Sequence, residues 1–397
     1  MRYRNIQGLR AIAAMLVFCS HLFWDIVPMR THWARPLVGG FGRSGVDIFF
    51  VISGFIIYHA VQRSAAQVAM VGRAQAAYEF AMKRIIRIYP LYWIVFAAAA
   101  IIMIWVPLTA PVPRMPQLEL LSLIGNIPNF RISVTWTLTF EVYFYAVAAL
   151  SIFLFPTRIF TGLHIWFAVI VGVVVASTVF GASIPLDYIF APIVLEFLLG
   201  MAIGFLIDRG EHRFPFVAIG VGLVWFVAGT YPLDQDGGRA ALSYLLRLIC
   251  WGMPSALIVY GMVALEMRKS WVMPKFLQYL GDASFSIYLW HTVLFYGIAA
   301  LFVQLGWVGV VNRSLLTLLM AVIALGGALL SYHFLEKPLL RILGKRIASR
   351  KTSGESRMRV GAARNARYRY AMPLRSRGIT VAHVWGTRSG RHGWLRR

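Results

Sequence analysis

The sequence predicts an all-α integral membrane protein, a bundle of about ten transmembrane helices with both termini in the cytoplasm. Hydrophobic residues make up 59% of the 397 residues and charged residues only 14%, whereas an ordinary soluble domain has about 25% charged residues. The mean hydropathy is +0.69. Apolar stretches long enough to cross a bilayer recur at 6–27, 46–62, 88–109, 137–156, 162–181, 187–207, 215–231, 243–266, 284–304 and 314–334.

Charged residues between these stretches set the predicted orientation. With a cytoplasmic N-terminus, fourteen Lys and Arg residues ahead of the last span lie on the inner side and eight on the outer side. Basic residues concentrate on the cytoplasmic side of membrane proteins. The first stretch also imitates a signal peptide, but Arg10 and His21 interrupt its apolar run and no small-residue cleavage site is evident. We therefore expect an uncleaved first span.

Two ionisable side chains lie within this first span. Arg10 and His21 are eleven residues apart, which on an α-helix is a rotation of about 20° and a rise of about 16 Å, so both lie on one face. Asp25 follows four residues later on the same face. Ionisable residues inside a bilayer are costly and normally face a bundle interior or a wet cavity, which indicates a functional stripe. The alternative is that Arg10 reaches the lipid headgroups and His21 makes an ordinary polar contact.

The second span begins with glycines and one acid. Its first half reads GRSGVDIFFVISGF from Gly42 to Phe55 and places Asp47 at the outer mouth, within reach of His21 or Asp25. Glycines allow a close approach of helix backbones here. The stretch is short, and its central Ile-Ser-Gly triplet also allows a re-entrant turn in place of a continuous helix.

The third span carries a pair of arginines at its cytoplasmic edge. Arg84 and Arg87 lie one helical turn apart. Two guanidinium groups on one face match a diphosphate, because each presents a planar fork of donors. The alternative is ordinary anchoring at the membrane surface, aided by the aromatic residues at 89, 92 and 93.

The fourth span opens with Trp136 and buries one carboxylate, Glu141, among aromatic residues. A buried acid needs a partner. Arg10 is expected to be too cytoplasmic, so the sequence favours His21 or a loop arginine. Such an acid is a candidate for acid–base chemistry or for binding an acceptor hydroxyl.

The ninth span opens with Ser284, Tyr288 and His291 on one helical face. These are candidates for substrate contact, and hydrogen bonding between helices is the favoured alternative for the serine. The last span ends with Glu336 at the basic cytoplasmic rim.

The chain changes character after residue 346. Residues 347–397 hold thirteen Lys and Arg residues and one acid. This surplus of twelve positive charges is half of the formal net charge of +24. We predict a transmembrane domain over 1–346 and a basic, disordered cytoplasmic tail over 347–397 that lies against anionic lipids. The same charge allows nucleic-acid binding, but a membrane bundle makes a nucleic-acid partner unexpected.

No motif for a metal or a nucleotide-fold cofactor is present. The two cysteines, Cys19 and Cys250, both fall in predicted spans, where buried apolar thiols are the norm, so neither a disulfide nor a metal site is expected. The sequence lacks CxxC, HExxH and Walker motifs and a GxGxxG that opens a helix.

Taken in order, the motifs resemble those of the membrane-bound acyltransferase-3 family over about residues 3–341, and the first span is most similar to the exopolysaccharide acetyltransferase branch. The matching features are Arg10 and His21, the stretch from Gly45 to Phe55, Arg84 and Arg87 before Tyr-Pro, Trp136 with Glu141, the stretch from Gly281 to His291, and Glu336 with Pro338. Many relatives carry two consecutive acids after the tryptophan, and here Val142 takes the second place.

The resemblance implies an enzyme of the bacterial inner membrane that acylates sugars of exopolysaccharides, lipopolysaccharides or other cell-surface glycans. Acyl-CoA is the implied donor, with its phosphates on Arg10, Arg84 and Arg87. His21 would act as general base or accept the acyl group transiently.

The remaining predicted site residues have supporting roles in this reading. The imidazole of His21 would be oriented by an acid, and acceptor contacts would come from the polar residues of the fourth and ninth spans. The acids are Asp25, Asp47 and Glu141, and the acceptor contacts are Trp136, Ser284, Tyr288 and His291. A secondary transporter is the alternative, since ten spans with charges at mid-membrane also describe one, although no internal repeat relates the two halves.

Overall fold

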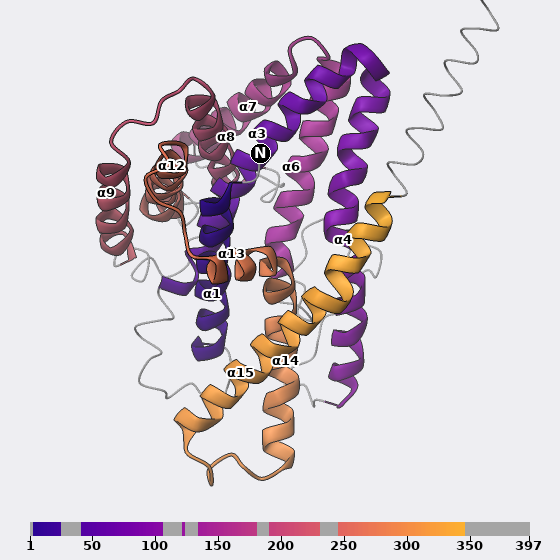
Figure 1. Cartoon of the computed structure of the whole chain (residues 1–397), viewed down its shortest axis with the longest axis vertical. Helices are drawn as coiled ribbons and strands as arrows, with labels where there is room; N and C mark the ends of the chain where they lie inside the picture. Colours follow the sequence, from indigo (N-terminus) through magenta and orange to yellow (C-terminus); the bar gives the residue numbers. More distant parts are fainter. Residues whose placement is uncertain are drawn as a thin grey trace, which may run out of the picture. The chain divides into compact units, whose positions relative to one another are not determined.

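The computed structural model describes residues 3–24, 41–105, 121–123, 134–180, 190–230 and 245–345. Within these ranges the chain forms helices and no strands (Figure 1), in agreement with the predicted all-α class. Asp25 and the basic tail lie outside the described residues. The elements are α1 (Arg4–Trp24), α3 (Gly45–Val71), α4 (Arg73–Trp105), α6 (Thr135–Leu154), α7 (Ile159–Phe180), η2 (Pro192–Val194), α8 (Leu195–Asp208), α9 (Pro215–Ala228), η3 (Leu248–Gly252), α12 (Met253–Met267), α13 (Lys275–Asp282), α14 (Ser284–Gln304), α15 (Arg313–Ser331) and η4 (Tyr332–Glu336).

Seven helices in the described ranges are long and apolar enough to cross a membrane. They are Arg4–Phe23, Gly45–Val71, Arg73–Ile102, Thr135–Leu154, Leu245–Met267, Ser284–Gln304 and Arg313–Lys345. At the other three predicted spans the structure has the shorter apolar helices Phe160–Ala176 and Pro215–Ala228 and the 14-residue α8. The count of ten spans and the cytoplasmic placement of both termini therefore stay predictions.

Helix α1 lies inside the bundle and packs against α3, α12, α13 and α14 (Figure 1). Its N-terminus is fixed by acceptors from α12, because the backbone N–H groups of Arg4 and Asn5 donate to the carboxylate of Glu266 at 2.8 and 2.7 Å. A carboxylate at this end of a helix satisfies donors that have no partner within the helix. The side chain of Asn5 is fully buried and hydrogen-bonds to the backbone of residues 262, 271 and 273.

Helix α3 is continuous for 27 residues, so the re-entrant turn that the short apolar stretch allowed does not form. The glycine at its centre serves packing against α8. A Cβ on Gly54 would lie 2.0 Å from the carbonyl oxygen of Phe197, and a Cβ on Gly200 would lie 1.9 Å from that of Val51. Because a glycine inside a helix costs only about 1 kcal/mol, close approach of two backbones is compatible with an unbroken helix.

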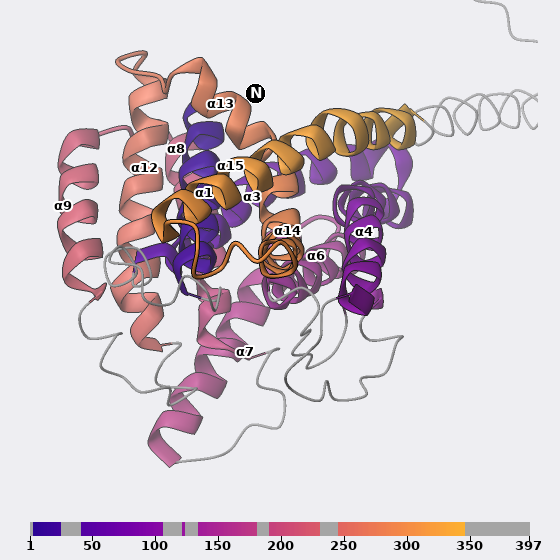
Figure 2. The ribbon, with the colours of Figure 1, turned by 90° about the horizontal axis from the view of Figure 1, so that it is seen from below.

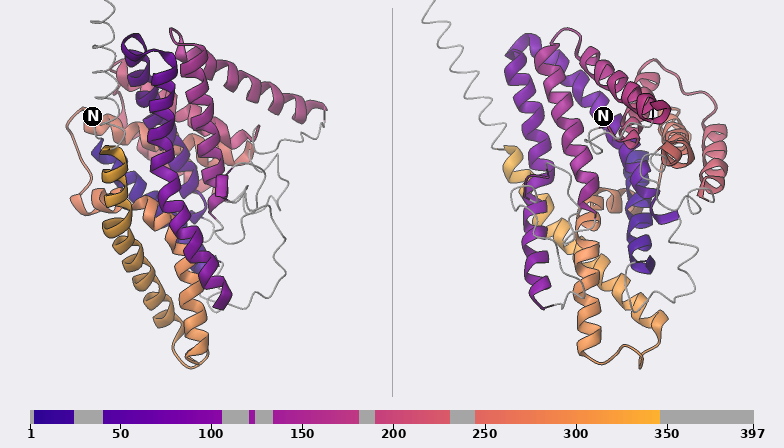
Figure 3. Two further views of the ribbon diagram at one scale, coloured as in Figure 1. Left: turned by 90° about the vertical axis from the view of Figure 1, so that its right-hand side faces the viewer. Right: turned by 180° about the vertical axis from the view of Figure 1, so that it is seen from behind.

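The connection between α3 and α4 is a single residue, Gly72, with φ of 83°. This left-handed conformation favours glycine. Helices α4 and α6 then pack side by side, and α14 and α15 form a hairpin joined by residues 305–312 (Figures 2 and 3). Helix α9 packs along α12, and both lie on the side of α1 that is away from α4 (Figure 2).

Two π-helical turns, η3 and η4, adjoin α12 and α15. A π turn holds one residue more than an α turn and is frequent at functional sites. Arg247 lies immediately before η3 and Glu336 is the last residue of η4. Both side chains enter the polar interior described next.

Candidate active site

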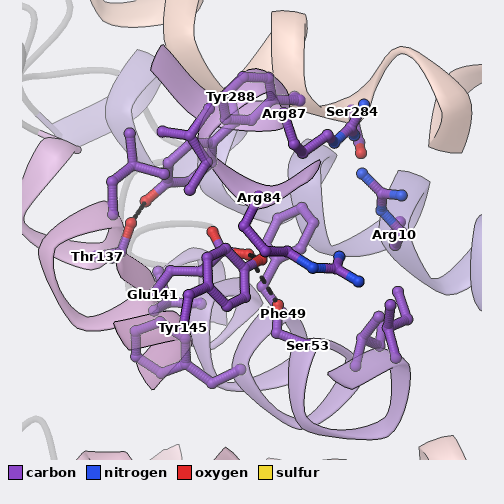
Figure 4. Close-up of a pocket in the computed structure, with 17 residues that line it drawn as sticks. Arg10, Phe49, Ser53, Arg84, Arg87, Thr137, Glu141, Tyr145, Ser284 and Tyr288 are labelled. Carbon is purple, nitrogen blue, oxygen red and sulfur yellow. Dashed lines mark hydrogen bonds between the residues drawn. The ribbon is translucent and has the colours of Figure 1, made fainter. Parts of the chain in front are cut away.

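The first of two polar cavities, which we call the arginine cavity, lies between α1, α3, α4, α6 and α14. Its volume is about 170 Å³. Arg10 enters it from α1 and Arg84 and Arg87 from α4, with Glu141 on the wall formed by α6 (Figure 4). The other polar lining residues are Ser53, Thr137, Tyr145, Ser284 and Tyr288. The three arginines predicted to act together therefore line one space, although 74 residues separate Arg10 from Arg84 along the chain.

Arg87 is held by a buried acid. Its guanidinium donates to Oε1 of Glu336 at 2.8 Å, and Oε2 of Glu336 accepts from the backbone N–H and the hydroxyl of Ser286 at 3.2 and 2.7 Å. Glu336 is 1% exposed. The arrangement joins α4, α14 and η4, and it fixes the direction of one guanidinium fork.

Arg84 lies in a different environment from Arg87. Its guanidinium carbon is 5.4 Å from the ring centre of Phe80 and 5.5 Å from that of Tyr145. Its Nε is buried and has no hydrogen-bond partner among the described residues. Arg84 thus carries a donor that the described residues leave unused.

Glu141 lies in the arginine cavity and not beside His21. Its Oε1 accepts hydrogen bonds from the hydroxyls of Tyr145 and Ser53. The expectation that Arg10 is too cytoplasmic to share its surroundings is wrong, since both line the same cavity. Five residues separate Trp136 from Glu141, a rise of about 7 Å and a rotation of about 140°, so Glu141 lies deeper along α6 than Trp136 and faces a different space.

That space is the second cavity, which we call the histidine cavity. It has a volume of about 260 Å³ and contains His21 from α1 and Arg247 from the segment before η3. Its other lining residues are Val17, Ser20, Gly42, Arg43, Val46, Val134, Trp136 and Tyr288. As the eleven-residue spacing predicts, Arg10 and His21 face polar space at two successive levels of α1.

Asp47 is paired with Arg247. Its two carboxylate oxygens accept from Nε and a terminal nitrogen of Arg247 at 2.9 and 2.8 Å, and Asp47 is fully buried. The same guanidinium donates to the backbone oxygen of Arg43 at 2.8 Å and lies 5.7 Å from the ring centre of Trp136. Such a bidentate pair fixes both groups, so Asp47 holds Arg247 on the wall of the histidine cavity.

Tyr288 forms the partition between the two cavities, because it lines both, as Val46 does. The Tyr288 hydroxyl lies 2.6 Å from Oγ1 of Thr137 and donates to the carbonyl oxygen of Val134 at 3.1 Å. The ring of Phe49 packs edge-on against it at 5.7 Å. The hydroxyl of Tyr288 is therefore fixed between the arginine cavity and the histidine cavity.

The other residues predicted to contact substrate divide between three places. Ser284 lines the arginine cavity and Trp136 lines the histidine cavity. His291, one turn beyond Tyr288, lines neither cavity and is 1% exposed. Its ring lies 5.1 Å from the ring of His21.

Sequence reasoning gave no role to two residues that line these cavities, Arg247 and Tyr145. It noted Glu336 as a motif residue at the basic rim but did not predict its pairing with Arg87. Glu141 and Tyr145 are four residues apart, a spacing that places side chains together on a helix and that would have indicated their contact. No local pattern indicated the long-range pairs of Arg247 and Glu336.

The described ranges contain no cluster of three or more His, Cys, Asp or Glu side chains that could hold a metal ion. The cavities instead offer guanidinium groups, a histidine and hydroxyls. Long apolar helices surround the adjoining arginine and histidine cavities. This arrangement is that of a membrane protein with an internal polar site.

The chain belongs to the acyltransferase-3 family: the Acyltransferase domain (Acyl_transf_3) matches residues 3–333. The protein is therefore an acyltransferase. It is 32% identical over 314 residues to the exopolysaccharide production protein ExoZ of Rhizobium meliloti strain 1021, covering 76% of this chain and 90% of the relative. It is 24% identical over 388 residues to the acyltransferase MdmB of Streptomyces mycarofaciens, covering 87% of this chain and 94% of the relative. No solved structure gives a significant match.

Proposed function

We propose that the protein transfers an acyl group, in the first instance acetyl, from acyl-CoA to a sugar hydroxyl of an exopolysaccharide, a lipopolysaccharide or another cell-surface glycan, in the bacterial inner membrane. The observation that carries the proposal is the convergence of three arginines in one cavity that adjoins the cavity of His21. Further support comes from the family and from the similarity to an exopolysaccharide production protein. Family membership favours this enzyme over the transporter that the predicted spans also allowed.

In the proposal, the arginine cavity receives the phosphates of acyl-CoA from the cytoplasm. Arg10, Arg84 and Arg87 provide three guanidinium groups. A planar guanidinium group can donate two hydrogen bonds to one phosphate. Arg87 is already aligned by Glu336, while the Nε of Arg84 has no hydrogen-bond partner among the described residues. The thioester arm would extend past Tyr288 toward His21.

The transfer step then takes place in the histidine cavity. His21 removes the proton from the acceptor hydroxyl as its oxygen attacks the thioester carbonyl carbon. The carbon–sulfur bond breaks, and the thiolate takes the proton from the imidazolium to leave as free thiol. General-base catalysis needs only hydrogen-bond reach to the hydroxyl, whereas a covalent acyl-histidine would require His21 to reach donor and acceptor in turn, so we favour the base.

Purified protein in detergent, supplied with acetyl-CoA and a glycan repeat unit, is expected to release free thiol in proportion to added acceptor. A thiol reagent measures the release, and mass spectrometry measures the added acetyl group on the sugar. Thiol release without an acetylated sugar would mean hydrolysis. Neither product with any glycan would overturn the proposed donor.

Arg84→Ala is expected to raise the KM for acetyl-CoA by roughly 10- to 100-fold, because a hydrogen bond to a charged group contributes about 1.5–3 kcal/mol. The acceptor KM should stay nearly unchanged. Arg84→Lys should restore only part of the donor affinity, since lysine keeps the charge and loses the planar fork. Calorimetric titration with acetyl-CoA measures the same loss directly.

Lys83→Ala is the matched control for this experiment. Lys83 is the neighbouring residue, its side chain is 55% exposed, and its ion pair is with Glu79. Its removal should leave the donor KM within about twofold, since surface ion pairs contribute little. If Arg84→Ala and Arg87→Ala both bind donor as the wild type does, the arginines are membrane anchors and the donor site lies elsewhere.

Deletion of residues 350–397 is expected to leave acetyl transfer largely intact. The family match ends at residue 333, and the tail lacks the apolar periodicity of a packed segment. Turnover of the truncated protein, normalised to the amount inserted in membranes, measures this. A stably inserted truncation without activity would place the tail in the catalytic unit.

A further inference from the structure

Arg10 and Arg84, two of the three arginines that line the arginine cavity, form no ion pair with a described residue. Arg87 is paired with Glu336. Arg10 instead donates to a side-chain amide oxygen at 3.5 Å, and Arg84 lies against two aromatic rings. Glu141, the acid on the cavity wall, accepts from two hydroxyls. Buried charge is costly unless it is paired, so the cavity is suited to an anionic group.

Ser284 adds a hydroxyl to the same cavity. It is the first residue of α14, is fully buried and lines the arginine cavity, and its Oγ has no hydrogen-bond partner among the residues that the structure describes. Figure 4 shows it on the side of the cavity where Arg10 and Arg87 lie. A buried hydroxyl without a partner is exceptional. Because a hydroxyl turns about one bond and can donate, it is suited to the same anion as the arginines.

The arginine cavity is too small for a whole nucleotide. Its volume is about 170 Å³, whereas cavities that hold a complete small-molecule ligand measure about 300–1,000 Å³. Acyl-CoA carries phosphate at two places, in the diphosphate next to its pantetheine arm and on the 3′ oxygen of its ribose. The size of the cavity favours the diphosphate, from which the narrow arm continues, over the ribose phosphate, which brings the nucleoside with it.

The arginine cavity and the histidine cavity follow one another along the same helices. On α6, Trp136 lines the histidine cavity and Glu141 lines the arginine cavity, while Tyr288 of α14 lines both. On α1, Arg10 and His21 are eleven residues apart, which is about 16 Å along the helix axis. A ligand that occupies both cavities therefore lies along α1 and has about this length.

The pantetheine arm has the length that separates Arg10 from His21. About thirteen bonds join the thioester sulfur to the phosphorus at the end of the arm, and an extended chain advances about 3.3–3.6 Å for every three bonds, so the arm reaches about 15 Å. The 3′-phosphate is about eight bonds further from the sulfur. With that phosphate at Arg10, an extended chain would run about 9 Å past His21.

We infer that the arginine cavity, with Ser284 among its donors, is the subsite for the diphosphate at the end of the pantetheine arm, and that the length of the arm places the thioester at His21. The adenosine and its 3′-phosphate stay outside the cavity. The inference rests on the proposed function and deepens it by naming the part of the donor that is recognised. Ser284 then contacts the donor, whereas the sequence suggested the acceptor.

A series of acetyl thioesters tests which phosphate is recognised. We expect acetyl-dephospho-CoA, which lacks only the 3′-phosphate, and acetyl-4′-phosphopantetheine, which also lacks the nucleoside, to keep kcat/KM within about tenfold of acetyl-CoA, since exposed charge pairs contribute little. Acetyl-pantetheine, which has the arm and no phosphate, should lose roughly 100-fold or more, because several charge-assisted hydrogen bonds are lost together. Mass spectrometry of the acetylated glycan repeat unit measures each rate.

An acetyl-CoA analogue without the β-alanine unit tests the role of arm length. Its arm is shorter by about four bonds, or about 4–5 Å, and its phosphates are unchanged. We expect its Kd in calorimetric titration to stay within about threefold of that of acetyl-CoA, and its kcat to fall by at least roughly 100-fold, because the reacting atoms are misplaced. Turnover equal to that of acetyl-CoA would exclude the role of arm length.

Ser284→Ala is expected to lower kcat/KM roughly tenfold for acetyl-CoA and for acetyl-4′-phosphopantetheine, and less than about twofold for acetyl-pantetheine. The difference arises because the hydrogen bond that is lost is made to phosphate, and a hydrogen bond to a charged group is worth about tenfold or more in affinity. Equal losses with all three donors would mean that Ser284 has only a structural role.

Ser255→Ala is the matched control. Ser255 of α12 is also fully buried, its Oγ likewise lacks a partner among the described residues, and it lines neither the arginine cavity nor the histidine cavity. Its kcat/KM should stay within about twofold of the wild type for all three donors, since no hydrogen bond is lost. Thermal unfolding in detergent checks that both serine variants are folded.

The donor series with the wild-type protein decides the inference even if Ser284→Ala unfolds. Acetyl-pantetheine as good as acetyl-CoA would overturn the phosphate subsite. A loss of roughly 100-fold on removal of the 3′-phosphate alone would assign the cavity to the ribose phosphate and overturn the inference as well. In both cases acetyl-CoA still acetylates the glycan, so the proposed function stands, whereas no acetyl transfer from any of these thioesters would overturn the proposed function itself.

Discussion

Replacement of His21 by alanine is expected to lower acetyl transfer by at least roughly 100-fold, because general-base catalysis contributes typically 10²–10⁴-fold. The imidazole lines the histidine cavity beside Arg247 and Trp136, and in the proposed step it alone takes the acceptor proton. The side chain borders open space, so its removal should not collapse the packing of α1. Acetyl-CoA-dependent thiol release, with membrane abundance measured in parallel, gives the result.

Cys19→Ala provides the control for this substitution. Cys19 lies two residues earlier on the same helix and lines neither polar cavity. Its variant should keep nearly full turnover. Turnover of His21→Ala within about tenfold of the wild type would exclude the catalytic role, and an equal loss of folded protein would make His21 a structural residue.

Gly54→Leu is expected to prevent stable folding of the bundle. Even a Cβ at this position would lie 2.0 Å from the carbonyl oxygen of Phe197, and a backbone oxygen cannot rotate away as a side chain does. Overpacking costs typically about 1–3 kcal/mol, and here α3 and α8 would have to separate along the extensive contact that joins them. Gly54→Ala should show the same effect at the upper end of that range, as a lower unfolding temperature in detergent.

Gly172→Ala tests whether this effect is specific to the helix crossing. Gly172 also lies within a helix, α7, and a Cβ there meets nothing within 4 Å. Removing a helical glycine should stabilise slightly, by about 1 kcal/mol or less. Equal unfolding temperatures for Gly54→Ala and Gly172→Ala would contradict the close approach of α3 and α8.

The helical class and the shared faces of Arg84 with Arg87 and of Arg10 with His21 could be predicted because they depend on local periodicity, whereas the grouping of Arg10 with the other two arginines was implied only by the family resemblance. Arg84 and Arg87 are one turn apart, and Arg10 and His21 are three turns apart on one face, so their spacing alone fixes which directions they share. The chemical cost of charge in a bilayer then implies a polar interior. These arguments need no knowledge of how helices pack.

The assignment of partners could not be predicted in the same way. Asp47 meets Arg247 across 200 residues, and Arg87 meets Glu336 across 249. Glu141 was expected to pair with His21 or a loop arginine because it was placed toward the outer side, yet it lies in the arginine cavity with Arg10. The level and the rotation of one helix against another both follow from packing, which local spacing does not give.

The two π turns allow the chain to hold one residue more without changing which faces the flanking helices present. A residue inserted into a regular α-helix rotates everything beyond it by about 100°, whereas a π turn takes up the extra residue within its wider winding. Arg247 therefore keeps its direction toward Asp47, and Glu336 keeps its direction toward Arg87. We expect homologous enzymes with a single-residue gap at 248–252 or 332–336 to have a regular α-helix there and to keep both charge pairs, so such a gap is a weaker mark of functional divergence than the loss of a paired residue.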